Sequence, residues 1–309
     1  MDIIEQAAKR LEQLRRAGVE LPEPTLVAPA PSPTMDIERA RSDVHVNPPV
    51  SKAIELDMSA LAAKGVITPE TVRSPLASEM RILKRPLLQN VARKGSAQLK
   101  DANLIMMTSA LPGEGKTFLS ANLAMSIAME LDHTVLLVDA DVARPSIPGL
   151  LGLGHEPGLL DVLTNPEIEL GSVLLRTNIE KLSILPAGTQ HARATELLAS
   201  DAMNRLLLEM SNRYSDRIII FDSPPLLVTT EARALATHMG QVVLVVRAEK
   251  TTHTEVKHAV AAIEACPVKM VVLNQAPAVV DGHGYGYGYG YGYGYGYGNK
   301  PAQPESSDS

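Results

Sequence analysis

The chain has 309 residues, 45% of them hydrophobic and 21% charged, and a formal net charge of −6. This composition supports one sizeable core, and the net negative charge argues against a nucleic-acid partner, because such binding depends on Lys and Arg that neutralise phosphates. The single cysteine, Cys266, excludes an intrachain disulfide, no signal-like segment opens the chain, and no apolar run approaches the roughly 20 residues that span a bilayer. We therefore expect a cytoplasmic protein that reaches a membrane only through a partner or a surface helix.

Residues 1–20 have the pattern of an amphipathic helix, with Ile4, Leu11 and Leu14 at heptad-like spacing and basic residues on other faces. Such a helix can dock on a partner helix, lie on an anionic membrane surface or pack on its own domain, and the sequence leaves all three open. Residues 21–50 hold seven prolines and few large apolar residues. That composition predicts a semi-extended linker.

Residues 51–100 are predicted to form a helical lead-in and oligomerisation segment. A short helical pattern there is closed by Gly65 and Pro69. A second helix follows, with Pro75 at its first position, where a missing N–H costs nothing. We expect this helix to be interrupted or kinked at Pro86.

The stretch LIMMTSALPGEGKTFL, residues 104–119, predicts a strand, a loop and a helix in that order. It matches the phosphate-binding pattern G-x-x-x-x-G-K-[ST] except at its first position, where Ala110 replaces glycine. In such a loop the backbone N–H groups and the positive end of the helix dipole face a polyphosphate, Lys116 reaches the outer phosphates, and the Thr117 hydroxyl binds magnesium. The expected nucleotide-binding residues are Pro112, Gly113, Glu114, Gly115, Lys116, Thr117 and Phe118.

Two further apolar strands end in carboxylates, one running into Asp139 and Asp141 and the other into Asp222. Ligands of an open α/β sheet bind outside the carboxyl ends of its strands, so these side chains should lie beside the phosphate loop. Carboxylates there can hold magnesium directly or through its waters, as a bound triphosphate requires. A single Asp after a strand is more often a helix cap, but two such strands and the loop together indicate a site for ATP and Mg²⁺.

Beyond the loop, apolar strands and helical patterns alternate as a parallel sheet requires. The patterns predict helix Lys116–Glu130, strand Thr134–Val138, strand Leu182–Leu185, helix Ala194–Tyr214, strand Arg217–Phe221, strand Gln241–Val246, helix Thr252–Cys266 and strand Val268–Leu273. The predicted fold class is therefore α/β, a P-loop NTPase with a mostly parallel sheet flanked by helices. We place this domain at residues 101–280.

Residues 281–309 form a tail in which glycine alternates with tyrosine from residue 284 to residue 298. Taken alone, such a repeat is typical of a self-association sequence. In a chain with a nucleotide site, exposed phenols indicate phosphate acceptors instead. The candidates are Tyr285, Tyr287, Tyr289, Tyr291, Tyr293, Tyr295 and Tyr297, seven of the chain's eight tyrosines.

With these motifs the chain, from about Glu79 to its C-terminus, resembles the bacterial tyrosine kinases of capsule and exopolysaccharide export, which are P-loop enzymes similar to partitioning ATPases. That family combines the phosphate loop (Walker A) with an Asp-x-Asp motif (Walker A′), a Walker B strand ending in Asp-x-Pro-Pro, and a C-terminal tyrosine cluster. All four are present here. The opening residues look like the exosortase-associated subgroup. One departure lies in Walker A′, where Ala143 stands at the usual arginine and Arg144 follows one place later.

The resemblance implies an ATP-dependent protein-tyrosine autokinase that phosphorylates its own tail in trans and regulates exopolysaccharide biosynthesis and export. Lys116, Asp139 and Asp141 would be catalytic, with Asp139 as the general base for the tyrosine hydroxyl. Thr117, Asp141 and Asp222 would organise the magnesium ion and its waters.

The resemblance also implies partners. In the family a Glu-x-x-Arg-x-x-Arg helix before the first strand contacts the neighbouring subunit of a ring. Arg81 fits the middle position of that motif and Lys84 replaces the last arginine. Because lysine lacks the bidentate fork of arginine, we expect a weaker or differently built contact, and a solvated charged helix is the alternative. Further implied partners are a membrane chain-length or export protein, which activates the kinase and recruits it to the inner face of the membrane, and a tyrosine phosphatase.

Two other functions are compatible with a P-loop. A positioning ATPase would switch a dimer by hydrolysis, but such enzymes usually carry a signature lysine five residues before the loop lysine, and here that position is Leu111. A catalytically silent nucleotide-binding regulator would have lost catalytic residues, whereas all the expected ones are present. The absence of the signature lysine and the presence of the catalytic residues therefore both favour the kinase.

Overall fold

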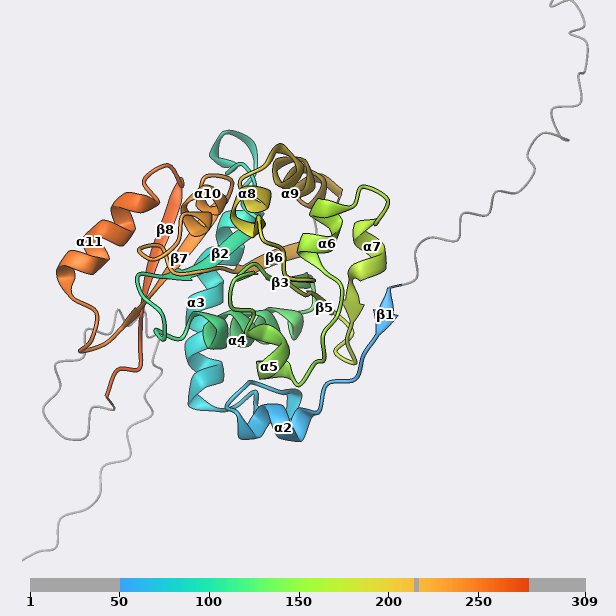
Figure 1. The fold of residues 1–309 in the computed structure, drawn as a ribbon. Coiled ribbons are helices and arrows are strands. Elements are labelled where there is room, and N and C mark those ends of the chain that lie inside the picture. Colours follow the sequence, from blue (N-terminus) through green and yellow to red (C-terminus); the bar gives the residue numbers. More distant parts are fainter. Residues whose placement is uncertain (1–50, 214–216, 278–309) are drawn as a thin grey trace, which may run out of the picture. The chain divides into compact units, whose positions relative to one another are not determined.

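The computed structural model of the chain describes residues 51–213 and 217–277 (Figure 1). The predicted N-terminal helix, the Pro-rich linker and the Tyr-Gly tail lie outside the described residues, so the predictions made for them stay predictions.

The described residues form an eight-stranded sheet with the order β1-β4-β5-β3-β6-β2-β7-β8. Every neighbouring pair is parallel except β4 and β5. The strands are β1 Lys52–Ala53, β2 Leu104–Ser109, β3 Thr134–Asp139, β4 Leu175–Arg176, β5 Leu182–Leu185, β6 Arg217–Asp222, β7 Gln241–Arg247 and β8 Val268–Asn274. The prediction of an α/β fold with a mostly parallel sheet is confirmed.

Helices cover both faces of the sheet (Figure 1). Helices α2 to α5 pack on one hydrophobic cluster and α6 to α11 on the other. The helices are α2 Met58–Ala63, α3 Pro75–Ala92, α4 Lys116–Ala128, α5 Ile147–Leu151, α6 Leu159–Thr164, α7 Leu170–Val173, α8 Ala194–Leu198, α9 Asp201–Arg213, α10 Glu231–Ala236 and α11 His253–Ala262. Side chains alternate between the two clusters along each strand: in β2, Leu104 and Met106 belong to one, and Ile105 and Met107 to the other. This explains why the predicted strands are uniformly apolar.

The strand register brings the predicted site together. Strand β6 pairs with both β2 and β3, and Asp222 lies opposite Met107 on one side and Asp139 on the other. The loop that follows β2 and the carboxylates that end β3 and β6 therefore meet at one edge of the sheet, as predicted.

One helix prediction is wrong and another is wrong in part. The region predicted as one helix, Ala194–Tyr214, is divided into α8 and α9, because the Ser200 side chain accepts from Met203 N (3.3 Å) and starts a new helix. Helix α3 is not interrupted at Pro86 and runs on to Ala92, whereas a kink at this proline stays a prediction. Leu83 and Leu87 are buried on either side of this proline, and their packing outweighs the roughly 3 kcal/mol that an interior proline costs.

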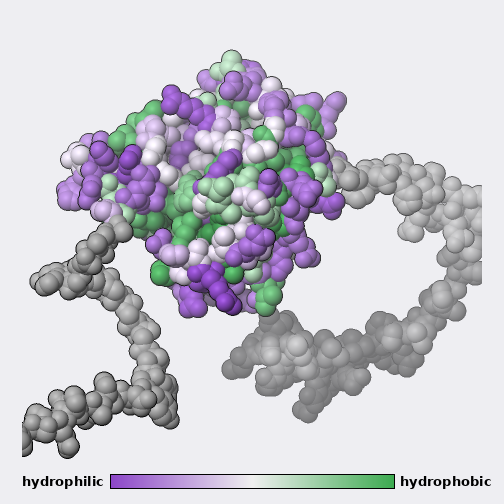
Figure 2. Space-filling model, turned by 90° about the horizontal axis from the view of Figure 1, so that it is seen from below, coloured by the Kyte–Doolittle hydropathy of each residue, from purple (hydrophilic) through white to green (hydrophobic). Residues whose placement is uncertain are grey.

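No helix in the described ranges is long and apolar enough to cross a bilayer. Seen from below, the surface is a mosaic in which hydrophobic residues lie among hydrophilic ones (Figure 2). Ile82, on the solvent side of α3, is one of the most exposed large hydrophobic residues, at 74%.

Candidate active site

The phosphate loop links the end of β2 to the first turn of α4. Its backbone needs two residues in the left-handed region, Gly113 (φ +81°) and Gly115 (φ +96°), where residues with a Cβ are strained. Gly115 is the N-cap of α4 and Lys116 its first residue. The first-turn N–H groups, which no helical carbonyl can satisfy, are thus available to an anion at this end of the helix.

The loop is held in shape from the β7 and β8 side of the sheet. The Glu114 carboxylate, 2% exposed, accepts from Leu111 N (2.8 Å), from Arg247 N (3.4 Å) and from the Thr251 hydroxyl. Asn274, at the end of β8, donates its Nδ2 to the Glu114 carbonyl at 2.8 Å. Sequence reasoning assigned only the backbone of Glu114 to the site, so this fastening by its side chain is a finding of the structure.

Replacing Gly115 by alanine is expected to lower the affinity for an ATP analogue at least tenfold. An alanine Cβ would lie 2.1 Å from Asn274 Nδ2, at a φ of +96°, and a left-handed residue with a Cβ costs roughly 1–2 kcal/mol. Titration calorimetry measures the affinity. Gly149→Ala is the matched control, because a Cβ there meets nothing within 4 Å; equal affinities in the two variants would contradict the prediction.

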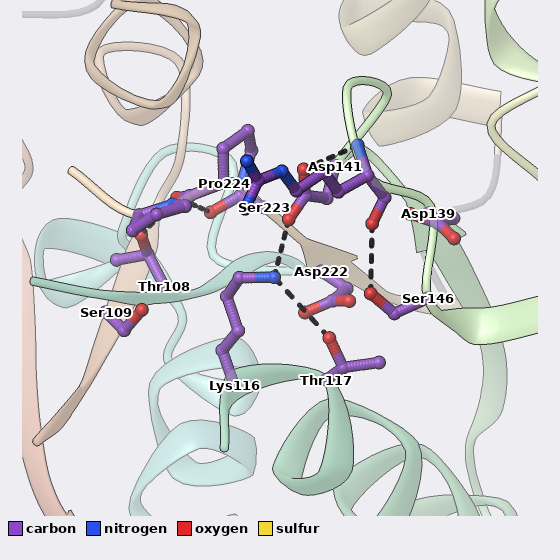
Figure 3. Close-up of polar contacts among 12 residues, drawn as sticks. Thr108, Ser109, Lys116, Thr117, Asp139, Asp141, Ser146, Asp222, Ser223 and Pro224 are labelled. Carbon is purple, nitrogen blue, oxygen red and sulfur yellow. Dashed lines mark hydrogen bonds and ion pairs between the residues drawn. The ribbon is translucent and has the colours of Figure 1, made fainter. Parts of the chain in front are cut away.

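Lys116 is paired with a carboxylate of the Walker A′ motif (Figure 3). Its Nζ lies 2.6 Å from Asp141 Oδ2 and 3.5 Å from Thr117 Oγ1. The other oxygen of Asp141 accepts from Arg144 N at 3.3 Å. Phosphate oxygens in the loop would compete with Asp141 for the Lys116 ammonium.

Asp139 and Asp222 are completely buried behind this ion pair. Asp139 Oδ2 accepts from Ile147 N at 3.1 Å, and Asp222 Oδ1 accepts from Ser120 Oγ at 3.1 Å. Burial raises the pKa of Asp139 to about 8, and the charges of Asp222 and Asp141 add to this. Burial also raises the pKa of Asp222 to about 6, although the Lys116 charge opposes the shift.

One oxygen of each buried carboxylate, Asp139 Oδ1 and Asp222 Oδ2, has no hydrogen-bond partner within the described part of the chain. Buried carboxylate oxygens without donors fit a cation or its bound waters. In residues 51–213 and 217–277 no group of three or more His, Cys, Asp or Glu is arranged to hold a metal ion. Mg²⁺ keeps several waters and takes its remaining ligands from one or two carboxylates and substrate phosphates, so the two unpartnered carboxylate oxygens fit it.

A cavity of about 550 Å³ opens over the phosphate loop. Asp141 lines this cavity, whereas Asp139 and Asp222 do not. The latter two side chains therefore lie behind the residues that line it. The remaining lining residues are Pro112, Gly113, Gly115, Lys116, Thr117, Phe118, Ala143, Arg144, Ser146, Pro225, Val228 and Thr229. Sequence reasoning left the role of Arg144 open and missed Ser146 and Thr229. These two residues lie in the loops that follow β3 and β6, and that position could have indicated that they border the site.

The two residues predicted at an oligomer contact do not lie together on an exposed face. Lys84 is buried, with Nζ 2.7 Å from Ser126 O and 2.5 Å from Glu130 Oε1, and so ties α3 to the carboxyl end of α4. Arg81 is exposed and donates to Val72 O at 2.9 Å. A contact with a neighbouring subunit through Arg81 stays a prediction.

Comparison with known proteins places this site in a family context. Residues 102–270 match the AAA domain family AAA_31. The chain is 33% identical over 167 residues to the tyrosine-protein kinase YwqD of Bacillus subtilis. This match covers 54% of this chain and 69% of that protein. It is 31% identical over 175 residues to the putative tyrosine-protein kinase CapB of Staphylococcus aureus, and this match covers 56% of this chain and 75% of that protein. It also matches the tyrosine-protein kinase ptk of Acinetobacter johnsonii, at 35% identity over 168 residues, but spans only 22% of that protein's length.

Solved structures agree with these sequence relatives. The chimerical protein CapA2B2 has a TM-score of 0.58 and 30% identity, covering 74% of this chain and 95% of that chain. The kinase domain of the Escherichia coli tyrosine kinase ETK has a TM-score of 0.57 and 25% identity, and the match covers 76% of this chain and 95% of that chain.

Proposed function

Because the chain belongs to the bacterial tyrosine kinase family and carries its AAA domain, we propose that it is an ATP-dependent kinase that phosphorylates the tyrosines of its own C-terminal tail. The observation that carries the proposal is the cluster at the carboxyl edge of the sheet. There the phosphate loop, the Lys116 ammonium and Asp141 line one cavity, and the buried Asp139 and Asp222 lie behind it at the ends of neighbouring strands.

In the proposed reaction, ATP places its phosphates on the loop and Lys116 turns from Asp141 to the γ-phosphate. A tyrosine oxygen bonds to the γ-phosphorus, the bond to the β–γ bridging oxygen breaks, and ADP leaves with the electron pair. The tyrosine proton goes to Asp139 in its ionised form, which is the minority form below its pKa of about 8. Thr117, Asp141 and Asp222 would hold the magnesium ion, which would supply neutralising charge to the phosphates; the protein residues position the groups and stabilise charge.

The proposed acceptors are the seven tail tyrosines, delivered in trans. A glycine-rich segment of 15 residues has a root-mean-square span of about 20 Å, by roughly 5–6 Å times √n, which suits delivery into a neighbouring subunit. We further propose a ring-like homo-oligomer, a membrane activator, a tyrosine phosphatase as antagonist and a role in exopolysaccharide export. These rest on the family resemblance, as does assignment to the exosortase-associated subgroup.

The direct test is to incubate the full chain with magnesium and γ-labelled ATP and to map the label by mass spectrometry. Label confined to the tail tyrosines is the expected result. A chain with all seven tail tyrosines replaced by phenylalanine is the control. Label that stays the same in the control, or ATP hydrolysis without any labelled tyrosine, would contradict the proposal.

Transfer in trans predicts an all-or-none result in a mixing experiment. A Lys116→Met chain keeps its tyrosines but cannot label them, and the phenylalanine-tail chain keeps its active site but offers no acceptor. Mixed, they should label the Lys116→Met tail at a rate that rises with the concentration of the phenylalanine-tail chain. An unlabelled mixture, beside a wild-type chain that labels itself normally, would show that transfer occurs within one chain.

A further inference from the structure

Helix α5 begins at the nucleotide cavity and is held at both ends by side chains from other elements. At its amino end, Ile147 N, the first N–H of the helix, donates to Asp139 Oδ2 at 3.1 Å. At its carboxyl end, Lys64 Nζ donates to the carbonyls of Gly149 (3.0 Å) and Leu150 (2.9 Å). Groups at the two ends of a helix have no partner within the helix itself, so these side chains satisfy them. The proposed reaction gives Lys64 no role so far.

Lys64 reaches α5 from a segment that is anchored on α4. It is the C-cap of α2, which lies beside α5 and below α4 in Figure 1. Just after this cap, Ile67 N donates to Asn122 Oδ1 at 2.8 Å, and Asn122 Nδ2 donates to Phe118 O at 2.9 Å. Ile67 and Asn122 are buried. The Lys64 ammonium is therefore held from α4, the helix that starts at the phosphate loop.

Helix α5 is short enough to carry a constraint from one end to the other. Its five residues span about 7.5 Å at 1.5 Å per residue. Pro148, in its first turn, has a fixed φ, and Ile147 and Leu151 are buried in the cluster that also contains Leu61 of α2. A shift of the carboxyl end would therefore move the Ile147 N–H that Asp139 accepts from.

The same shift would move part of the cavity wall. Ser146, the N-cap of α5, lines the nucleotide cavity, and so does Arg144 two residues before it. Fixing α5 thus fixes both the hydrogen bond of the proposed base and the wall beside it. The phosphate loop is held separately, from the β7 and β8 side, through the Glu114 carboxylate and Asn274.

Resting on the proposed function, we propose that Lys64 is a positioning residue for phosphoryl transfer. It fixes the carboxyl end of α5, and α5 in turn holds the Asp139 carboxylate and the cavity wall at Ser146. Because the phosphate loop has its own supports, Lys64 acts on the rate of transfer and not on the affinity for nucleotide. A displacement of about 1 Å at a reacting group commonly costs 10²-fold in rate, so a loss of this support should be measurable.

The test removes the two bonds of Lys64 and compares the result with a matched loss elsewhere. Lys64→Met keeps the length and apolar stem of the side chain. Lys181→Met is the control, because Lys181 Nζ also donates to two carbonyls, those of Glu130 (2.8 Å) and Leu131 (2.6 Å). Lys181 lies just before β5, at the amino end of the strands, so its bonds do not reach the site. Lys64→Arg restores a cationic donor.

The first readout is single-turnover labelling of the full chain at saturating ATP, with the affinity for an ATP analogue measured by calorimetry. We expect Lys64→Met to transfer at least tenfold more slowly than the parent, with an affinity within twofold of it. Lys64→Arg should recover most of the rate, and Lys181→Met should keep it. Equal rates in the two methionine variants, an arginine variant as slow as Lys64→Met, or an affinity that falls as much as the rate would each overturn the proposal.

The second readout needs no catalysis. Amide hydrogen exchange, followed by NMR without nucleotide, reports on the bond between Ile147 N and Asp139. The Ile147 amide should exchange at least tenfold faster in Lys64→Met than in the parent, and unchanged in Lys181→Met, at matched distance below each melting temperature. Unchanged exchange at Ile147 in Lys64→Met would overturn the proposal even if the rate fell.

The two readouts together separate Lys64 from the kinase assignment. Faster exchange at Ile147 in Lys64→Met, in a protein whose parent never labels a tyrosine, would retain the hold of Lys64 on α5 and refute the kinase. Normal tyrosine labelling by Lys64→Met would retain the kinase and refute the positioning role.

Discussion

Replacing Lys116 by methionine is expected to reduce tail phosphorylation by about 10²- to 10³-fold, the usual cost of losing one positioned donor at a developing charge. Lys116 Nζ is the cation that lies over the phosphate loop, 2.6 Å from Asp141. Methionine keeps the length and apolar stem of the side chain but cannot neutralise a transferring phosphoryl group. Single-turnover labelling with saturating ATP isolates this step from nucleotide binding.

Lys257→Met is the matched control, because Lys257 is exposed on α11. It should label its tail at the wild-type rate. Circular dichroism must show that Lys116→Met is folded, since the substitution leaves Asp141 without its cation. A folded Lys116→Met chain that labels its tail at the wild-type rate would show that the chemistry does not take place at this loop.

The sequence predicts the central strands well because each is an apolar run long enough to stand out. Strands β3, β6, β7 and β8 all begin where predicted and end one residue later than predicted. The shared edge follows from topology alone, since parallel strands point their carboxyl ends the same way. This is why the aspartates that end β3 and β6 were assigned to the site without any coordinates.

Contacts between distant parts of the chain are what the sequence does not reveal. Lys84 belongs to a charged pattern typical of a helix surface, yet its ammonium is buried against Ser126 and Glu130, about 40 residues away. The Glu114 carboxylate accepts hydrogen bonds from Arg247 N and from the Thr251 hydroxyl, which follow it by 133 and 137 residues in the chain. Helices of four to six residues, such as α6 and α7, are too short to display a helical period.

Replacing Asp139 by asparagine is expected to remove transfer and to stabilise the protein at the same time. General bases contribute about 10²- to 10⁴-fold to rates, so labelling should fall by that factor. Asparagine still accepts from Ile147 N through its carbonyl, so the bond at 3.1 Å and the nucleotide cavity are kept. An ATP analogue should therefore bind with near wild-type affinity in calorimetry.

The stability gain follows from the raised pKa of Asp139, about 8 in the folded chain against an ordinary 3.8. Between these values the folded chain keeps a proton that the unfolded chain has released, so the free energy of unfolding falls as pH rises, by up to about 1.4 kcal/mol per pH unit. Asparagine removes this proton linkage. The melting temperature of Asp139→Asn should therefore exceed that of the parent by a margin that grows from pH 5 to pH 8, without nucleotide or magnesium present.

Asp132→Asn, an exposed carboxyl, serves as the control and should follow the parent at every pH. Three results would each change the assignment of Asp139. Loss of analogue binding in Asp139→Asn would make it mainly a metal-site residue, and a margin that stays constant with pH would mean that it is ionised in the folded chain. Full transfer in Asp139→Asn, together with loss of transfer in Asp141→Asn, would move the base to Asp141, which lines the cavity that Asp139 lies behind.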